Sequence, residues 1–203
     1  MLGRMSFAAT ERSRLADTLL RVGPNAPTLC QGWETRDLAE HLYVRENNQL
    51  ALMPGVGKVF ADKISNRDYA DLVKDWAAGP PLLLKPVDSM MNTAEHFVHH
   101  EDVLRGDGVA RPREFSKAVN KELALLAGRF GKLLLRSAPV PVVLSPTTLP
   151  PMTVGDRRGV AEQGDDVVRV VGEPGELLLW VFGRDVVEVT VTGDPQHVGQ
   201  SRG

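Results

Sequence analysis

The chain lacks several features that identify large classes of proteins. It contains a single cysteine, Cys30, in 203 residues. No disulfide can therefore form within the chain, which indicates a reducing compartment. Nothing near Cys30 suggests a lowered thiol pKa, so we interpret it as packed and unreactive rather than as a nucleophile. No apolar run approaches the roughly 20 residues that cross a membrane, and the N-terminus does not have the pattern of a signal peptide. These absences predict a cytoplasmic protein that makes no contact with membranes.

A strong charge of one sign is also missing. The formal net charge is −2 at pH 7, the sequence pI is about 6.2, and lysine and arginine are scattered along the chain. Proteins that bind nucleic acids usually carry a basic stripe or patch, so the sequence argues against that class. The length is sufficient for one domain, or two small ones, to bury a core without disulfides.

The first two-thirds of the chain has the apolar spacing of helices. We predict helices over residues 6–22, 36–50, 69–76, 88–105 and 113–136. Gly23-Pro24 should end the first helix, Thr35 should cap the second, and Gly106 should end the fourth. The last helix carries an apolar stripe made of Val119, Leu123, Leu126, Phe130 and Leu133 or Leu134.

The composition changes at Pro139, after which proline, glycine and β-branched residues become frequent. Four segments have the composition of strands: VPVVLS, DVVRVVG, ELLLWVFG and VVEVTVTG. The third is apolar on both faces, so we expect it at the centre of a sheet. The sequence therefore predicts an α+β protein. A helical bundle would occupy residues 1–138, and a small, mainly β module would occupy residues 139–203.

Three side chains from two predicted helices could meet on one metal ion. Glu95 and His99 are four residues apart and project from the same helix face, together with Met91 and Val98. That face should point into the bundle, where a carboxylate needs a cation or hydrogen bonds. His41, on another helix, would complete a site with three protein ligands. Three ligands and an open position are typical of catalytic zinc, although nickel, iron or manganese would accept the same residues.

The same spacing has plainer interpretations. Helix surfaces often carry Glu and His four residues apart, and a lone histidine is more often a hydrogen-bonded bystander than a ligand. His96 and His100 form an HxxxH pair, but Phe97 stands where the zincin motif requires Glu. Both turn away from Val98, so we interpret them as surface residues or as supports for the ligands, and His100 is the reserve ligand.

Two further residues have candidate roles. Asp102, one turn beyond His99, could accept the second N–H of the ligand imidazole or hold a water, or it could form an ion pair with Arg105. Arg45, four residues after His41, could bind an anionic group of a substrate or cofactor, or it could simply be solvated.

Three segments, GPNAPTLCQGWETRDLAEHLYVRE, NTAEHFVHHEDVLR and GEPGELLLWVFGR, together resemble the mycothiol-dependent maleylpyruvate isomerase family, specifically its metal-binding relatives. The resemblance extends over nearly the whole chain. It implies a DinB-like four-helix bundle followed by a small α/β domain similar to sterol carrier protein. It also implies an ion, usually zinc, bound by His41, Glu95 and His99. An arginine of the C-terminal domain contributes to activity in the isomerase, and Arg184 is the matching position here.

The resemblance leaves two functional classes open. In the first, a metal-dependent isomerase or transferase uses a small-molecule thiol, mycothiol, whose thiolate attacks an electrophilic substrate. In the second, the chain is a non-catalytic protein that binds a metal or a small ligand. Hydrolysis by a metal-activated water is a third option, but Asp102 and Glu101 are the only evident general bases. The identity of the substrate and the formation of a homodimer stay open.

Overall fold

The computed structural model describes residues 6–47, 64–79, 89–155 and 167–194. This part of the chain contains six helices and one four-stranded sheet, so the α+β class is confirmed. The chain divides into two compact units, residues 1–109 and residues 110–203. None of the described helices is both long and apolar enough to span a bilayer.

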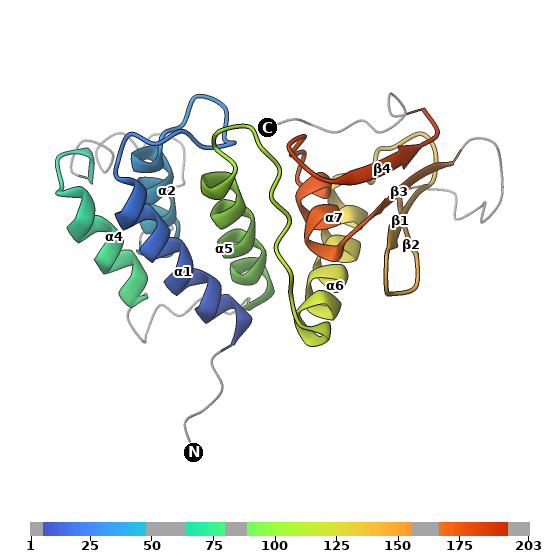
Figure 1. Ribbon diagram of the computed structural model, residues 1–203, viewed down its shortest axis with the longest axis horizontal. Coiled ribbons are helices and arrows are strands. Elements are labelled where there is room, and N and C mark those ends of the chain that lie inside the picture. Colours follow the sequence, from blue (N-terminus) through green and yellow to red (C-terminus); the bar gives the residue numbers. More distant parts are fainter. Residues whose placement is uncertain (1–5, 48–63, 80–88, 156–166, 195–203) are drawn as a thin grey trace, which may run out of the picture. The chain divides into compact units, whose positions relative to one another are not determined.

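The first unit contains four named helices: α1 (Phe7–Val22), α2 (Thr35–Asn47), α4 (Tyr69–Ala78) and α5 (Ser89–Leu104). Ser6 caps α1 by accepting a hydrogen bond from the amide of Ala9, and Asp68 caps α4 in the same way. In space, α1 packs against α5 and α4, and α2 packs against α4 (Figure 1). The four helices agree with the predicted ones, except that residues 48–50 and 88 of the predictions lie outside the described part.

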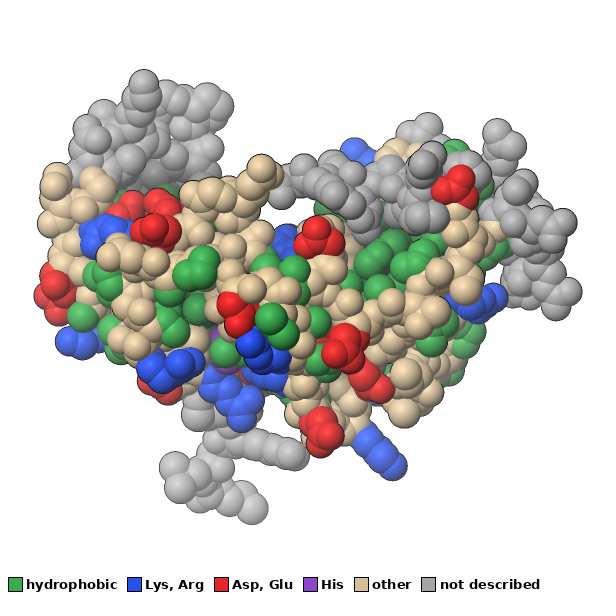
Figure 2. Space-filling view, turned by 45° about the horizontal axis from the view of Figure 1, so that its top comes forward, with side chains coloured by type: hydrophobic (Ala, Val, Ile, Leu, Met, Phe, Trp, Pro, Cys, Tyr) green, Lys and Arg blue, Asp and Glu red, His purple; other side chains and the backbone are tan. Residues whose placement is uncertain are grey.

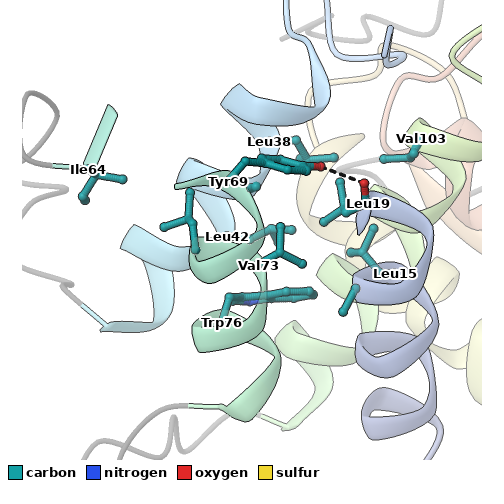
Figure 3. Packing of buried hydrophobic residues seen from close by; sticks show 12 residues of the cluster. Leu15, Leu19, Leu38, Leu42, Ile64, Tyr69, Val73, Trp76 and Val103 are labelled. Atoms are coloured by element: carbon teal, nitrogen blue, oxygen red, sulfur yellow. Dashed lines mark hydrogen bonds between the residues drawn. The ribbon is translucent and has the colours of Figure 1, made fainter. Parts of the chain in front are cut away.

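A cluster of buried apolar side chains joins these helices. Its members include Leu15, Leu19, Leu38, Leu42, Tyr69, Leu72, Trp76 and Val103. Figure 3 shows side chains of this cluster converging from α1, α2, α4 and α5, with the hydroxyl of Tyr69 donating to the carbonyl of Leu19 at 3.0 Å. Each fully buried leucine contributes about 1.5–3 kcal/mol to the free energy of unfolding. The core therefore holds α2 rigidly, with His41 placed on the helix between the buried Leu38 and Leu42.

Helix α5 is unusual because polar side chains are buried on more than one side of it. His96 is 2% exposed and its Nε2 lies 3.0 Å from Oε1 of Glu46 on α2. His100 is 4% exposed and its Nδ1 lies 2.9 Å from Oε2 of Glu11 on α1. Of the two interpretations of these histidines, surface residues or supports for the ligands, the first is wrong, because α1 and α2 both provide buried carboxylates to α5. Almost no histidine reaches the face drawn in Figure 2, where acidic and basic side chains are interspersed.

The second unit combines two helices with the sheet. Its elements are α6 (Lys117–Leu134), β1 (Val142–Pro146), β2 (Met152–Gly155), β3 (Val168–Gly172), α7 (Pro174–Val181) and β4 (Val189–Thr192). The strand order is β2-β1-β3-β4. Strands β1 and β3 are parallel, and the other neighbouring pairs are antiparallel. Helices α6 and α7 pack against each other and both contact the sheet (Figure 1).

Three of the four predicted strands are confirmed as β1, β3 and β4, but ELLLWVFG is not a strand. Its residues form most of α7, in which all eight residues are buried. A segment that is apolar on every side has neither helical nor strand periodicity, so its pattern could not separate the two. Pro174 at the helix start and Glu176 in the first turn are helix signals that outweigh the strand composition. Strand β2 was not predicted.

Helix α6 explains why the two units meet at residues 109 and 110, whereas the sequence pattern predicts a boundary at 138. It packs against α7 and β2, and the tilted rings of Phe130 and Phe182 have their centroids 5.0 Å apart. Gly131 lets the helix approach the sheet, since a Cβ there would lie 2.9 Å from Val154. An apolar stripe shows that a helix is half-buried but not which partner it packs on. Leu133 and Leu134, assigned to that stripe as alternatives, are both exposed.

Candidate metal centre

The connector between α1 and α2 lies against the end of α5. The amide of Leu29 donates to the carbonyl of Asp102 at 3.0 Å. Close approach also requires Gly106, because a Cβ at that position would lie 2.0 Å from the carbonyl oxygen of Pro27. The glycine that follows α5 therefore does more than end the helix. It lets the connector approach closely enough for Cys30 to reach an acidic side chain of α5.

Thr35 fastens the other end of the connector. It is the first residue of α2, and its hydroxyl donates to the carbonyl of Gly23. The same hydroxyl accepts from the amide of Ala26. Asp37 accepts a hydrogen bond from the amide of Glu34 at 2.9 Å. Thr35 thus ties the connector to the helix, and Asp37 reaches back to the amide of the residue before the helix, as the acidic member of a capping box does.

The structure brings His41, Glu95 and His99 together. One ligand atom of each lies within 4.8 Å of the others. Nε2 of His99 lies 3.3 Å from Oε2 of Glu95, and Nε2 of His41 lies 3.9 Å from the same oxygen. The two imidazole rings meet edge to face, with their centroids 5.3 Å apart. The imidazole nitrogens of His99 on α5 and of His41 on α2 thus both lie close to one carboxylate oxygen of Glu95.

That carboxylate oxygen is buried but makes no hydrogen bond within the described part of the chain. An unsatisfied buried polar atom costs about 1–3 kcal/mol. Burial raises the pKa of Glu95, but the imidazoles of His41 and His99 and the guanidinium of Arg45 outweigh it and hold the pKa well below its ordinary value. Glu95 is therefore an anion at neutral pH, with nitrogen atoms around it at distances longer than a good hydrogen bond.

The second ring nitrogen of His99 points to Asp102. Nδ1 of His99 lies 2.9 Å from Oδ2 of Asp102, which is fully buried. Burial lowers the pKa of His99, but contacts with Asp102, Cys30 and Glu95 outweigh it and hold the pKa well above its ordinary value. A carboxylate that fixes one imidazole nitrogen directs the other toward a ligand. Of the interpretations of Asp102, the contact with His99 is present, and Nε of Arg105 lies 2.7 Å from Oε2 of Glu101.

Cys30 belongs to this arrangement, which the sequence did not indicate. Its thiol donates to Oδ2 of Asp102 at 3.3 Å, and Cys30, His99 and Asp102 form a second group that could hold a cation. Trp33 from the same connector lies beside His41, with ring centroids 5.3 Å apart. No local motif near Cys30 or Trp33 predicts these contacts, because they depend on how the connector folds over α5.

Two arginines were predicted to serve the site. Arg45 lies beside it, with Nε 3.5 Å from Oε2 of Glu95 and Nη1 donating to Asn92 at 3.1 Å. Arg184 belongs to the second unit, where its Nη1 donates to the carbonyl of Phe182 at 2.8 Å. The geometry of the first unit therefore accounts for Arg45 as a neighbour of the candidate ligands, and the role of Arg184 stays a prediction.

The chain matches no protein-family model and none of the curated proteins compared with it. Two solved structures do match. One is mycothiol-dependent maleylpyruvate isomerase, with a TM-score of 0.60 and 14% identity over 91% of this chain and 88% of the isomerase chain. The other is a histidine-to-alanine mutant of that isomerase, with a TM-score of 0.60, 13% identity and the same coverage. The chain therefore has the fold of mycothiol-dependent maleylpyruvate isomerase, the fold that its three sequence segments had indicated.

Proposed function

We propose that His41, Glu95 and His99 bind a divalent metal ion, best matched by zinc, in an enzyme that uses a small-molecule thiol for isomerisation or transfer. The observation that carries this proposal is the buried carboxylate oxygen of Glu95, which faces two imidazole nitrogens without a hydrogen bond. A cation would satisfy that oxygen and use the imidazole nitrogens at the same time. Two neutral imidazoles and one carboxylate are a donor set that suits zinc.

The spacing of the three ligand atoms fits such an ion. Ligands of a tetrahedral zinc ion, at about 2.0–2.1 Å from the metal, lie about 3.3 Å from one another. The separation between Glu95 and His99 already has that value, and the separation between Glu95 and His41 is 3.9 Å. The His41 side chain is 31% exposed. Three protein ligands would leave one coordination position of the ion open, and the exposure of His41 would let a thiol reach that position from solvent.

The residues around the trio support thiol chemistry. A bound divalent ion lowers the pKa of a thiol that binds to it, and so supplies thiolate near neutral pH. Asp102 would keep a proton on Nδ1 of His99, and the ion would replace the proton on Nε2, which would then be the ligand atom. Addition of the thiolate to an activated alkene would form a carbon–sulfur bond and move the π electrons onto the activating carbonyl. Rotation about the resulting single bond, followed by elimination of the same thiolate, would re-form the alkene as the other isomer. Displacement of a leaving group from a saturated carbon would instead transfer the thiolate to the substrate and release that group. The fold shared with a mycothiol-dependent isomerase favours mycothiol as the thiol, and a reducing cytoplasm would keep it reduced.

Arg184 enters the proposal as the arginine that supports activity. A guanidinium binds carboxylate groups through two parallel hydrogen bonds, in bidentate geometry, which suits a substrate that carries a carboxylate. The alternative function, metal or small-ligand binding without catalysis, has the same metal site, so the two are separated by turnover.

The test combines purified protein, zinc, mycothiol and an electrophile, either maleylpyruvate or a haloalkane. We expect turnover that depends on both zinc and mycothiol, and we expect His41→Ala to abolish it. Glu40→Gln, on the same helix as His41, is the matched control and should retain turnover. Equal rates for the wild-type protein and His41→Ala would contradict the proposal. Tight zinc binding without any affinity for mycothiol would favour the non-catalytic alternative.

Replacing Asp102 with Asn should weaken zinc binding about 10–100-fold, because His99 would lose the carboxylate that orients it. The readout is zinc affinity in competition with a chromophoric chelator. Glu40→Gln, at a carboxylate that belongs to no candidate metal group among the described residues, is the control and should change the affinity less than about threefold. Unchanged affinity in Asp102→Asn would show that Asp102 does not orient the ligand.

A further inference from the structure

Arg45 places a positive charge beside Oε2 of Glu95, the oxygen that the proposed ion would bind. Its Nε lies 3.5 Å from Oε2 of Glu95, whereas the two candidate imidazole ligands lie 3.3 Å and 3.9 Å from that oxygen. The Arg45 side chain is 18% exposed, and Asn92 holds it through a hydrogen bond to Nη1. A guanidinium is always charged. Without a metal, it is therefore one of the counter-charges of Glu95.

A divalent ion on Glu95 would remove that pairing. The ion would neutralise the carboxylate, so that the guanidinium would face a nearby cation in a partly buried place, where like charges repel strongly. The guanidinium is held beside the site, because its Nη1 donates to Asn92 at 3.1 Å and the side chain is 18% exposed. An anion beside Arg45 would restore the balance of charge.

We propose that Arg45 is the receptor for a carboxylate group of the ligand, and that its site becomes available when the metal binds to Glu95. This inference rests on the proposed metal site. The planar guanidinium fork matches the two oxygens of a carboxylate, and the amide of Asn92 carries N–H donors that can join it. Metal and carboxylate then bind with positive coupling, and each raises the affinity for the other by the same factor.

The probes are zinc, benzoate and benzamide, which has the shape of benzoate without its charge. Zinc affinity is measured with a chromophoric competitor, with and without each organic compound, and benzoate affinity is measured by NMR with and without zinc. For the wild-type protein we expect benzoate to tighten zinc binding about tenfold, within the usual range of coupling between sites. Zinc should raise benzoate affinity by the same factor, and benzamide should have no effect. Inorganic phosphate serves as a further arm, and coupling as strong as that of benzoate would overturn the assignment to a carboxylate.

Arg45→Gln separates the two roles of the guanidinium. Without an anion, this variant should bind zinc more tightly than the wild-type protein, because the competing charge is gone, and benzoate should no longer affect it. Arg45→Lys keeps the charge but not the fork, so it should bind zinc like the wild-type protein and lose most of the benzoate effect. Arg36→Gln, which removes an arginine of the same helix paired with Glu40, should keep both properties. Circular dichroism verifies that each variant is folded.

Two outcomes overturn the inference in distinguishable ways. If the wild-type protein binds zinc with an affinity that benzoate does not alter, or if benzoate still tightens zinc binding to Arg45→Gln, the linkage through Arg45 is wrong and the metal site stands. If the wild-type protein binds no zinc, the proposed metal site itself is wrong.

Discussion

Glu95→Gln should remove high-affinity zinc binding and, with it, the thermal stabilisation that zinc gives to the wild-type protein. The substitution keeps the size of the side chain but replaces the anionic ligand oxygen, which lies 3.3 Å and 3.9 Å from the two imidazoles, with part of a neutral amide. We expect the affinity to fall by more than the roughly 10–100-fold that loss of a ligand's supporting partner costs.

The size of the thermal effect follows from mass action. A ligand present at about one hundred times its dissociation constant stabilises the folded state by about 2.7 kcal/mol, which corresponds to a Tm increase of about 10 °C for a unit of this size. Zinc should raise the Tm of the wild-type protein accordingly, and a chelator should reverse the increase. Glu95→Gln should show neither response.

The control for this experiment is Glu40→Gln on α2. Glu40 is a partly exposed carboxylate paired with Arg36 and belongs to no candidate metal group. It should respond to zinc like the wild-type protein. A Glu95→Gln protein that still gains several degrees from zinc would show that the metal binds elsewhere, for example at Cys30, His99 and Asp102.

Glu46→Gln should cost about 3 kcal/mol of stability at pH 7, which makes it the largest expected effect outside the metal centre. Glu46 is 4% exposed. Its Oε1 lies 3.0 Å from Nε2 of His96, and its Oε2 lies 2.6 Å from Nη2 of Arg12. Arg12 also donates to the carbonyl of Trp76 at 2.8 Å and lies over its ring. Removing one member of a buried ion pair leaves the other charge without compensation, which typically costs 3–5 kcal/mol.

The pH dependence of this loss has a definite sign. Burial raises the pKa of Glu46, but His96 and Arg12 outweigh it, so the pKa in the folded state lies below the ordinary value of 4.5. A carboxylate with a lowered folded pKa stabilises the protein above its unfolded pKa and loses that contribution as the pH falls through its folded pKa. The difference between the wild-type protein and Glu46→Gln should be complete at pH 7 and should shrink below about pH 4.5.

Urea-induced unfolding followed by circular dichroism, at pH 7 and at pH 4, measures this difference. Glu40→Gln is again the matched control. Burial raises the pKa of Glu40, and although Arg36 lowers it, the net shift is upward. Its ionised form is thus disfavoured in the folded state, and the variant should be neutral or slightly stabilised at pH 7. Equal stabilities of Glu46→Gln and the wild-type protein at pH 7 would contradict a stabilising role for the buried pair.

Local patterns were sufficient for most of the helices and for part of the candidate site. The spacing of Glu95 and His99 placed both on one face of α5, since residues four apart on a helix are neighbours whatever surrounds them. The alternation of valine with polar residues from Val187 to Val191 likewise predicted a half-buried strand, which is β4. His41 was proposed as the third ligand from its place on the apolar side of another predicted helix, and the resemblance implied the same residue, but no local rule placed it near Glu95.

Where local patterns failed, the missing information was the identity of the packing partner. His96 and His100 looked like surface residues until Glu46 and Glu11 from other helices covered them. The apolar run around Leu178 was compatible with a strand or a helix, and only the helix signals of Pro174 and Glu176 at its start distinguished the two.

Residue spacing alone thus determined the α+β class, the main helices and the pairing of Glu95 with His99, because these depend on neighbours within a few positions of the chain. Tertiary structure decided which unit holds α6, which histidines are buried, and that Cys30 and Arg45 adjoin the candidate ligands. Those contacts join residues that are dozens of positions apart, and their free energy depends on partners that no local pattern specifies.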